Sequence, residues 1–517
     1  MKKIYTTVAV ALVALLTLPS CDSFLDVLPD SRTQMGNKEG DTEKSLDRLQ
    51  KLLVSAYPTM VPMPIFEHRT DNVMDNGPRF SSPDGSDIYQ NYTWQGNTDA
   101  AGDNTQGLWN ACYSAIATSN EALVALETFD QSEPKVSAIR GEALVTRAFS
   151  HFLLVNTFCQ AYNKETSDSD LGIPYVTKPE TKIGTTYERG TVASVYKQID
   201  EDLMTGMALI QDSYSVPAYH FTKKATYAFA AKFYLYYEKW QLAKEYATRA
   251  LGNNIAPQLR DLKAISDKST TPEEWGINYS HVDNPANYLV IAMYSSWFRG
   301  LAYQARYGHH TQIMETQTLK SPGPWGNVLP AFDSGIYHLT SSAAENNFLA
   351  KYYEIFEITD AVAGIGYPHV LYVAFTSDET LLYRAEAEVL LGEYDQAAKD
   401  LSLYYASKGA PSRDYSVDEI TAFYAQKVKD EAPVAKPLHP RFAIEEGTQT
   451  NMLHAVLHAR RIETIHSGQR WEDIKRYGIE ITHNIFNAPA ITLKSVDNRR
   501  AIQIPNDNIS AGITPNP

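Results

Sequence analysis

Residues 226–252 read TYAFAAKFYLYYEKWQLAKEYATRALG, and their apolar periodicity predicts two helices joined by a tight turn. A related stretch, TLLYRAEAEVLLGEYDQAAKDL, occupies residues 380–401. Three positions correspond when the two copies are superposed: Ala231 with Ala385, Trp240 with Tyr394, and Ala243 with Ala397. Packed helices touch at positions of this kind, so we expect the chain to repeat one helical hairpin.

The arrangement of small and aromatic residues resembles that of tetratricopeptide-like repeats. In such repeats a small residue in the first helix lets the second helix approach, and here Gly392 would supply the turn of the later copy. One hairpin cannot bury its own apolar face, so hairpins stack into a scaffold. We therefore predict a mainly α fold built on a tetratricopeptide-like helical-hairpin scaffold. The alternative is two unrelated pairs of amphipathic helices.

The composition is that of a globular protein with an acidic surface. The 517 residues carry a net charge of −15, which does not attract a phosphate backbone, so we exclude nucleic acid as a partner. The chain has 33 Tyr, 18 Phe and 7 Trp, and such rings both pack cores and stack on sugars. Cys112 and Cys159 lie in apolar helical patterns that favour buried free thiols, and whether they pair stays open.

The first residues have the three parts of a secretory signal. Lys2 and Lys3 precede an apolar run at residues 8–18, and Cys21 follows a short LPS sequence. The run is too short to span a bilayer, so we expect residues 1–20 to be removed. The sequence LPSC, which ends at Cys21, resembles a bacterial lipobox, in which the cysteine is acylated. Acyl chains such as palmitate on Cys21 would anchor the protein to a membrane. The alternative is a secreted soluble protein.

The remaining segments alternate between helices and loops. Four further helices are predicted at residues 45–57, 107–127, 134–158 and 191–210. Between residues 58 and 107 the sequence reads as one long loop, and residues 253–378 form a loop-rich insertion. The runs NYLVIAMY and HVLYVAF predict short β-strands in this insertion. Helices resume after the second hairpin, and the last residues are irregular.

Six segments, in order along the chain, resemble the SusD/RagB family of outer-membrane lipoproteins. They are CDSFLDVLP after the lipobox, GEALVTRAFSHFLLVNTF, LGIPYV, RGTVASVYKQIDEDL, RRIETIHSGQRWEDIKRYG and the closing IPNDNISAGITPNP. The resemblance implies a surface-exposed protein without enzymatic activity or cofactor that binds an oligosaccharide and passes it to a SusC-like TonB-dependent transporter. With it we divide the chain into a signal peptide at 1–20, an N-terminal SusD-like region at 21–225 and a C-terminal region at 226–517.

The resemblance also implies where a glycan would bind. Family members that bind glycans place acidic, basic, amide and aromatic residues in the first long loop and in the central insertion. The residues at those places here are Asp71, Arg79, Trp94, Asn97, Tyr294 and Trp325. An aromatic face can cover the apolar side of a sugar ring while the polar groups bind its hydroxyls. Trp297 is a reserve candidate whose apolar neighbours favour packing.

Other constellations give weaker indications. The charged segment at residues 460–476 has the three- and four-residue spacings of a helix face, which favours a structural role. His454 and His458 share a helix face, but no glutamate follows His454 as a zinc protease would require, and we predict no metal site. Two alternatives stay open: a RagB-like peptide-binding protein of the same architecture, and a surface glycoside hydrolase, which needs only two carboxylates.

Overall fold

The protein is described here by a computed structural model. It describes residues 39–78, 86–96, 103–181, 187–298, 306–341, 344–360 and 363–517. The expected signal peptide, Cys21, Arg79 and Asn97 lie outside these residues. The chain divides into two compact units, Met1–Gln50 and Lys51–Pro517. In the first unit the structure describes the start of helix α3 (Glu39–Ser55), which confirms the helix predicted before Pro58.

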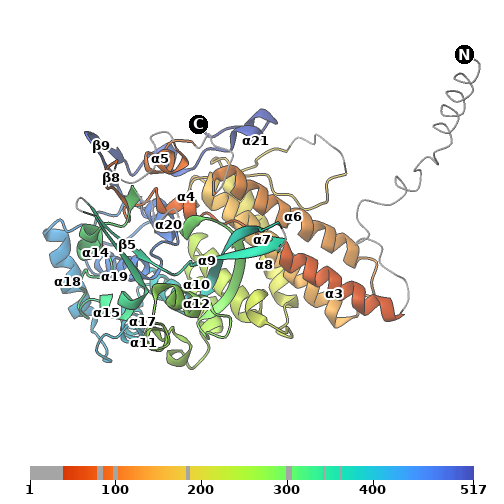
Figure 1. Ribbon diagram of the computed structural model, residues 1–517, viewed down its shortest axis with the longest axis horizontal. Helices are drawn as coiled ribbons and strands as arrows, with labels where there is room; N and C mark the ends of the chain where they lie inside the picture. The colour runs from red at the N-terminus through yellow and green to blue at the C-terminus, as the bar shows by residue number, and fades with distance from the viewer. Residues whose placement is uncertain are drawn as a thin grey trace, which may run out of the picture. The chain divides into compact units, whose positions relative to one another are not determined.

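The second unit is mainly helical, as predicted (Figure 1). Its first long helices are α6 (Thr105–Leu126), α7 (Pro134–Phe158) and α8 (Val192–Leu209). The hairpin helices are α9 (Lys223–Tyr236) with α10 (Trp240–Leu251), and α16 (Ser377–Leu390) with α17 (Tyr394–Ser407). The C-terminal helices are α18 (Val417–Lys429), α19 (Thr448–Glu463) and α20 (Gln469–Arg476). Local chemistry sets their ends: Pro134 opens α7, and the Thr191 side chain caps α8 by accepting from the Ser194 amide.

The two predicted hairpins are present and they stack on each other. Helix α9 packs on α10, α16 packs on α17, and α10 contacts α16. The four alanines at corresponding positions are completely buried: Ala231, Ala243, Ala385 and Ala397. Gly392 has a φ of 78°, so it supplies the left-handed turn between α16 and α17. The repeated pattern in the sequence therefore corresponds to repeated helix crossings.

Helices α7 and α8 approach closely because each has a glycine at the crossing. A Cβ atom at Gly206 would lie 2.8 Å from the backbone oxygen of Gly141, which is too close for any side chain. Across the same interface Arg147 makes two hydrogen bonds to the carboxylate of Asp202, at 2.6 and 2.7 Å. Small residues thus allow the approach, and a buried ion pair sets the relative position of the two helices.

Much of the aromatic content packs the core. Phe149 of α7 makes edge-to-face contacts with Phe229 of α9 at 5.4 Å and with Phe375 of the insertion at 5.5 Å. These contacts connect the helical scaffold to the sheet inserted between the hairpins.

Cys112 and Cys159 are both buried free thiols, which answers the question that the sequence left open.

The insertion contains the short strands that the sequence predicts. Strands β2 (Asn287–Tyr294), β7 (Ile365–Thr376) and β6 (Glu354–Asp360) form an antiparallel sheet in the order β2-β7-β6. A separate hairpin pairs β4 (Ile336–Ser341) with β5 (Ala344–Leu349). The short helices here are α11 (Leu262–Asp267), α12 (Pro272–Ser280), α14 (Thr311–Gln317) and α15 (Leu329–Phe332). Inward-facing residues of β2, such as Leu289 and Met293, have no exposed surface and join the common core.

Two regions differ from the sequence-based expectation. The segment predicted as one long loop contains α4 (Met63–Glu67), β1 (Met74–Asp75) and α5 (Asp87–Tyr92), and β1 pairs with β3 (Tyr307–Gly308). Before the tail, β8 (Ile481–Ile485) pairs with β9 (Ala488–Leu493), and the tail holds α21 (Asn506–Ser510). Figure 1 shows β8 beside α5, where the Tyr92 hydroxyl donates to the backbone oxygen of Asn484 at 2.8 Å. These elements are too short to show an apolar periodicity in the sequence. They depend on contacts between segments that are far apart along the chain, such as this hydrogen bond.

Candidate functional site

Asp71 lies in a buried ionic cluster. It is 6% exposed, and its carboxylate accepts two hydrogen bonds from Arg470, at 3.0 and 3.2 Å. It also accepts from Lys436 Nζ at 2.6 Å, and Arg461 lies 3.4 Å away. Burial by itself would raise the pKa of Asp71, but these three cations lower it well below its ordinary value. The carboxylate is thus engaged by protein groups and is not free for a sugar hydroxyl.

Trp94 and Trp325 are also enclosed by the protein. Trp94 is 2% exposed, its Nε1 donates to the backbone oxygen of Arg69, and its ring stacks on His483 at 4.4 Å. Trp325 is 4% exposed and stacks on Tyr405 of α17 at 3.6 Å. This corrects the expectation that the two indoles form an exposed platform. The reserve candidate Trp297 is 3% exposed as well, in agreement with packing.

The Gly/Pro-rich sequence around Trp325 has a packing reason. A Cβ atom at Gly323 would lie 2.3 Å from Trp325 Nε1, so the loop folds directly over the indole and only glycine fits there. The Gly/Pro-rich sequence suggested an exposed binding loop, but it belongs to a loop that covers the buried indole of Trp325. Of the predicted site residues that the structure describes, Asp71, Trp94 and Trp325 are therefore enclosed by the protein and do not form one exposed surface.

Tyr294 is different because its ring is open to solvent. It is 56% exposed at the end of β2 and faces His369 of β7 across the strand pair. The ring centroids of Tyr294 and His369 are 5.0 Å apart. Tyr367, two residues before His369 and therefore on the same face, is 52% exposed with its ring 6.0 Å from Tyr294. We call Tyr294, Tyr367 and His369 the aromatic face.

Polar groups adjoin the aromatic face. His369 Nε2 lies 2.9 Å from the carboxylate of Glu357, which comes from β6 and pairs with Tyr367 across the strands. Behind the end of β2, the half-buried Asp103 carboxylate accepts from the Ser295 hydroxyl and from the Ser296 amide, both at 3.1 Å. Burial raises the pKa of Asp103, while these hydrogen bonds oppose the shift. The face thus combines two open rings with a histidine–carboxylate contact whose polar atoms can bind hydroxyls.

The sheet that carries this face concentrates exposed apolar surface. Among the described residues, fifteen large apolar or tyrosine side chains are exposed, and six belong to this sheet. They are Tyr294, Ile355, Phe356, Ile358, Ile365 and Tyr367. Concentrated exposed apolar surface is typical of a binding region. The sequence-based prediction missed Tyr367 and His369, although the alternation of Ile365, Tyr367 and His369 before an apolar strand gave a signal.

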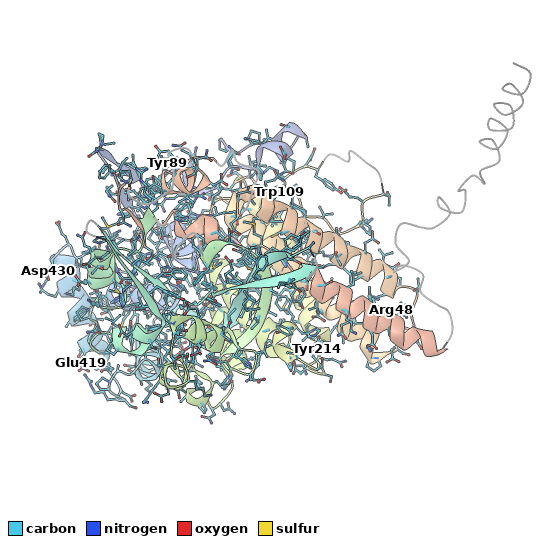
Figure 2. The ribbon with its side chains drawn as sticks, in the orientation of Figure 1. Arg48, Tyr89, Trp109, Tyr214, Glu419 and Asp430 are labelled. Atoms are coloured by element: carbon cyan, nitrogen blue, oxygen red, sulfur yellow. The ribbon has the colours of Figure 1, made fainter. Side chains whose placement is uncertain are left out.

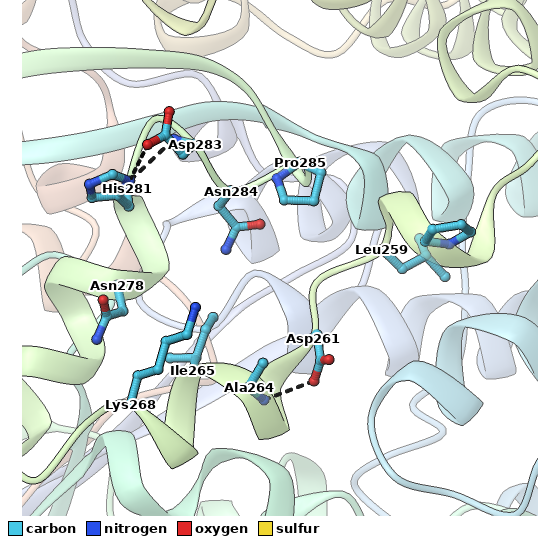
Figure 3. A pocket seen from close by; sticks show the side chains of 11 residues that line it. Leu259, Asp261, Ala264, Ile265, Lys268, Asn278, His281, Asp283, Asn284 and Pro285 are labelled. Carbon is cyan, nitrogen blue, oxygen red and sulfur yellow. Dashed lines mark hydrogen bonds and ion pairs between the residues drawn. The ribbon is translucent and has the colours of Figure 1, made fainter.

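A second candidate is the polar pocket in Figure 3, with a volume of about 520 Å³. Two of its polar side chains bind nearby backbone: Asp261 accepts from the Ala264 amide at 2.9 Å, and His281 accepts from the Asp283 amide at 3.2 Å. Among the residues that line it there is no Phe, Tyr or Trp. Without such a ring to cover a sugar's apolar side, this pocket fits an oligosaccharide less well than the aromatic face does.

The charged C-terminal segment has the structural role that its spacing predicts. Arg460 is completely buried and pairs with Glu386 of α16 and with Asp473 of α20. Arg476 also pairs with Glu386, at 2.8 Å. These ion pairs hold the C-terminal helices on the scaffold.

Within the described residues no group of three or more His, Cys, Asp and Glu side chains could hold a metal ion. None of the helices described is long and apolar enough to cross a membrane.

Comparison with known proteins supports the resemblance. Residues 23–235 match the model of a SusD-like family described as starch-binding and associating with the outer membrane. A SusD superfamily protein from Bacteroides thetaiotaomicron has 20% identity and a TM-score of 0.62, covering 91% of this chain and 99% of its own. A laminarin-binding SusD-like protein has 18% identity and a TM-score of 0.58, covering 92% and 99%.

A SusD-like carbohydrate-binding protein from Bacteroides vulgatus has 18% identity and a TM-score of 0.54, covering 87% of this chain and 89% of its own. No curated protein sequence matches the chain. The family resemblance indicated by the six sequence segments is confirmed. The chain therefore has the SusD-like fold, and its residues 23–235 carry the sequence pattern of the SusD-like family.

Proposed function

We propose that the protein is a surface-exposed outer-membrane lipoprotein that binds an oligosaccharide and delivers it to a SusC-like TonB-dependent transporter. The observation that carries this proposal is the aromatic face, where Tyr294 and Tyr367 expose more than half of their surface beside His369. Binding and transfer need no bond breaking, so the proposed protein is not an enzyme. The laminarin-binding and carbohydrate-binding proteins of the same fold support this assignment.

The geometry of the aromatic face suits a sugar chain. The two tyrosine rings stand at 78° to each other, so one can cover the apolar side of a sugar ring while the other contacts its edge or the next unit. Glu357 and His369 can accept from and donate to hydroxyl groups. Arg79 and Asn97 remain proposed contacts through the family resemblance alone.

The cellular part of the proposal rests on the N-terminal sequence. A signal at residues 1–20 and a lipobox ending in Cys21 would place acyl chains at the start of the mature protein. The description of the matching family, which associates with the outer membrane, agrees with such an anchor. In this arrangement the membrane is reached through lipid on Cys21, and the transporter receives the bound glycan.

The test is calorimetric titration of the chain from Asp22 onward with laminari- and malto-oligosaccharides. Tyr294→Ala and Tyr367→Ala are each expected to weaken binding by about 1–3 kcal/mol, the scale of an aromatic anchor. Tyr219→Ala is the matched control, because Tyr219 is also exposed but its 3-10 helix lies beside Asn287 and Tyr288, at the opposite end of β2 from Tyr294. Unchanged affinity in both sheet variants would remove the aromatic face as the site. Cleavage of the glycan, or binding of peptides alone, would contradict the proposal itself.

A further inference from the structure

A pocket of about 610 Å³ lies where helix α18 ends and α19 begins, far along the chain from the aromatic face. Figure 2 labels Asp430, which follows the last residue of α18. The apolar part of its wall comes from Ala425, Val428, Ala432, Pro437 and Leu438. Val428 is 44% exposed, so this wall is open to an incoming molecule. The volume is in the range of about 300–1,000 Å³ that is usual for small-molecule sites.

Four nitrogen-bearing side chains line the pocket: His454, Lys436, Lys429 and Asn451. Two of them, His454 and Lys436, interact with the charges of the Asp71 cluster. His454 lines the pocket and is 4% exposed, and within the described part of the chain its imidazole has no hydrogen-bond partner. Burial, with a smaller effect of Arg470, lowers the pKa of His454 to about 4, so the ring is neutral near pH 7. A neutral imidazole offers one donor and one acceptor, and a buried ring without partners leaves both available to a ligand.

The second side chain is Lys436, which connects the pocket to the Asp71 cluster. Its ammonium group donates to Asp71 at 2.6 Å, and 24% of its side chain is exposed. An ammonium group has three donors, so this hydrogen bond leaves two of them. Burial lowers the pKa of Lys436, and Asp71 opposes this while Arg461 and Arg470 lower it further. The lysine thus remains under repulsion from two neighbouring cations.

The cluster behind the pocket has an excess of positive charge. Arg461, Arg470 and Lys436 all face the single carboxylate of Asp71. Glu67 also attracts Arg461, so two carboxylates partly balance the three cations, and Asp473 already pairs with Arg460. An anion placed beside Lys436 would reduce the repulsion within the cluster. At the rim, the exposed Glu431 and Glu446 would repel a ligand that carried a second negative group.

We propose that this pocket binds a small molecule that carries one carboxylate on an apolar body. The carboxylate lies between Lys436 and His454, where the ammonium group and the imidazole N–H donate to it, and the apolar body packs on the wall formed by Val428 and Leu438. This site is separate from the proposed glycan site in its elements and in the chemistry of its ligand. A short aliphatic acid and the C-terminal apolar residue of a peptide share this chemistry.

The experiment uses the chain from Asp22 onward, titrated calorimetrically with hexanoate and with its neutral counterpart hexanamide. Hexanoate is expected to bind at least about tenfold more tightly than hexanamide, because only the acid carries the charge. His454→Leu and Lys436→Met are each expected to weaken hexanoate binding by a similar factor. Lys399→Met, at an exposed position on α17, should leave it unchanged.

A further readout separates binding from folding, because Lys436→Met also disturbs the Asp71 cluster. In the unaltered protein, NMR titration of His454 should show its pKa rising when hexanoate is bound, since a nearby carboxylate favours the imidazolium. N-acetyl-leucine tests the peptide source: tighter binding than hexanoate indicates a peptide end, and weaker binding indicates a free aliphatic acid. Binding of neither acid, equal binding of hexanamide, or an unchanged His454 pKa would overturn the proposal.

Discussion

Replacement of Asp71 by asparagine is expected to lower the free energy of unfolding by about 3–5 kcal/mol, because removal of one partner leaves buried charges without compensation. Three cations lie within 3.4 Å of this carboxylate. At an effective dielectric constant of about 20, each pair near 3 Å contributes about 5 kcal/mol before desolvation is subtracted. Asparagine keeps the shape and one acceptor but removes the charge, so the three cations would face each other alone.

The measurement is chemical denaturation of the Asp71→Asn variant beside Asp168→Asn, a control at an exposed aspartate. The pKa of Asp71 is lowered in the folded protein, so its contribution is complete above its ordinary pKa of about 3.9 and is lost as the pH falls below that value. The difference between wild type and variant should therefore shrink in acid. A variant that lost glycan binding without losing stability would refute this reasoning and return Asp71 to the binding site.

Two further predictions concern the same scaffold. Burial, together with the Asp400 carboxylate, raises the pKa of Glu388 to about 8, and Arg384 already binds Asp400 at 2.7 Å. Near pH 8 the folded state therefore holds a proton on Glu388 that the unfolded state has lost, and this difference costs stability. Glu388→Gln removes that cost, so it should stabilise the protein by about 1–3 kcal/mol near pH 8 and by almost nothing near pH 4. Thermal unfolding at the two pH values measures the difference. Trp325→Ala should cost about 3–5 kcal/mol of stability, as removal of a buried indole does. It should leave oligosaccharide affinity unchanged at a temperature where the variant is folded, and weakened affinity there would show that the indole contacts ligand.

The long helices could be predicted from the sequence because their determinants are local. The prediction for α7 has the observed bounds, since Pro134 fixes its start and the apolar pattern continues to Phe158. The repeated hairpin was recognisable because helix crossings require small residues at fixed positions. The short elements α4, α5 and the β8-β9 hairpin were not predicted, because contacts between distant segments stabilise them. An example is the hydrogen bond from Tyr92 to Asn484.

The binding surface was harder to predict, since exposure depends on what covers a side chain. Trp325 is buried because Tyr405, from the second hairpin, stacks on it, and Trp94 is buried because His483 does. Neither partner is near in sequence, and loop composition cannot indicate them. Tyr294 could be predicted as a candidate, but its openness follows from the face of β2 on which it lies, since Met293 and Ser295 on either side of it are buried.

The electrostatics of the two proposed sites select different ligands. Two carboxylates near the aromatic face are Glu357 and the half-buried Asp103, and the chain as a whole carries a charge of −15. An anionic glycan would be repelled there, so neutral sugar chains fit this surface better. Beside Lys436 the local balance is reversed, since Lys436, Arg461 and Arg470 outnumber the nearby carboxylates of Asp71 and Glu67. Local charge dominates at that pocket because salt screens distant charges beyond about 10 Å while buried neighbours stay unscreened. One acidic protein can therefore hold a neutral sugar on its sheet and a carboxylate in the pocket between α18 and α19, and neither ligand would compete for the other site.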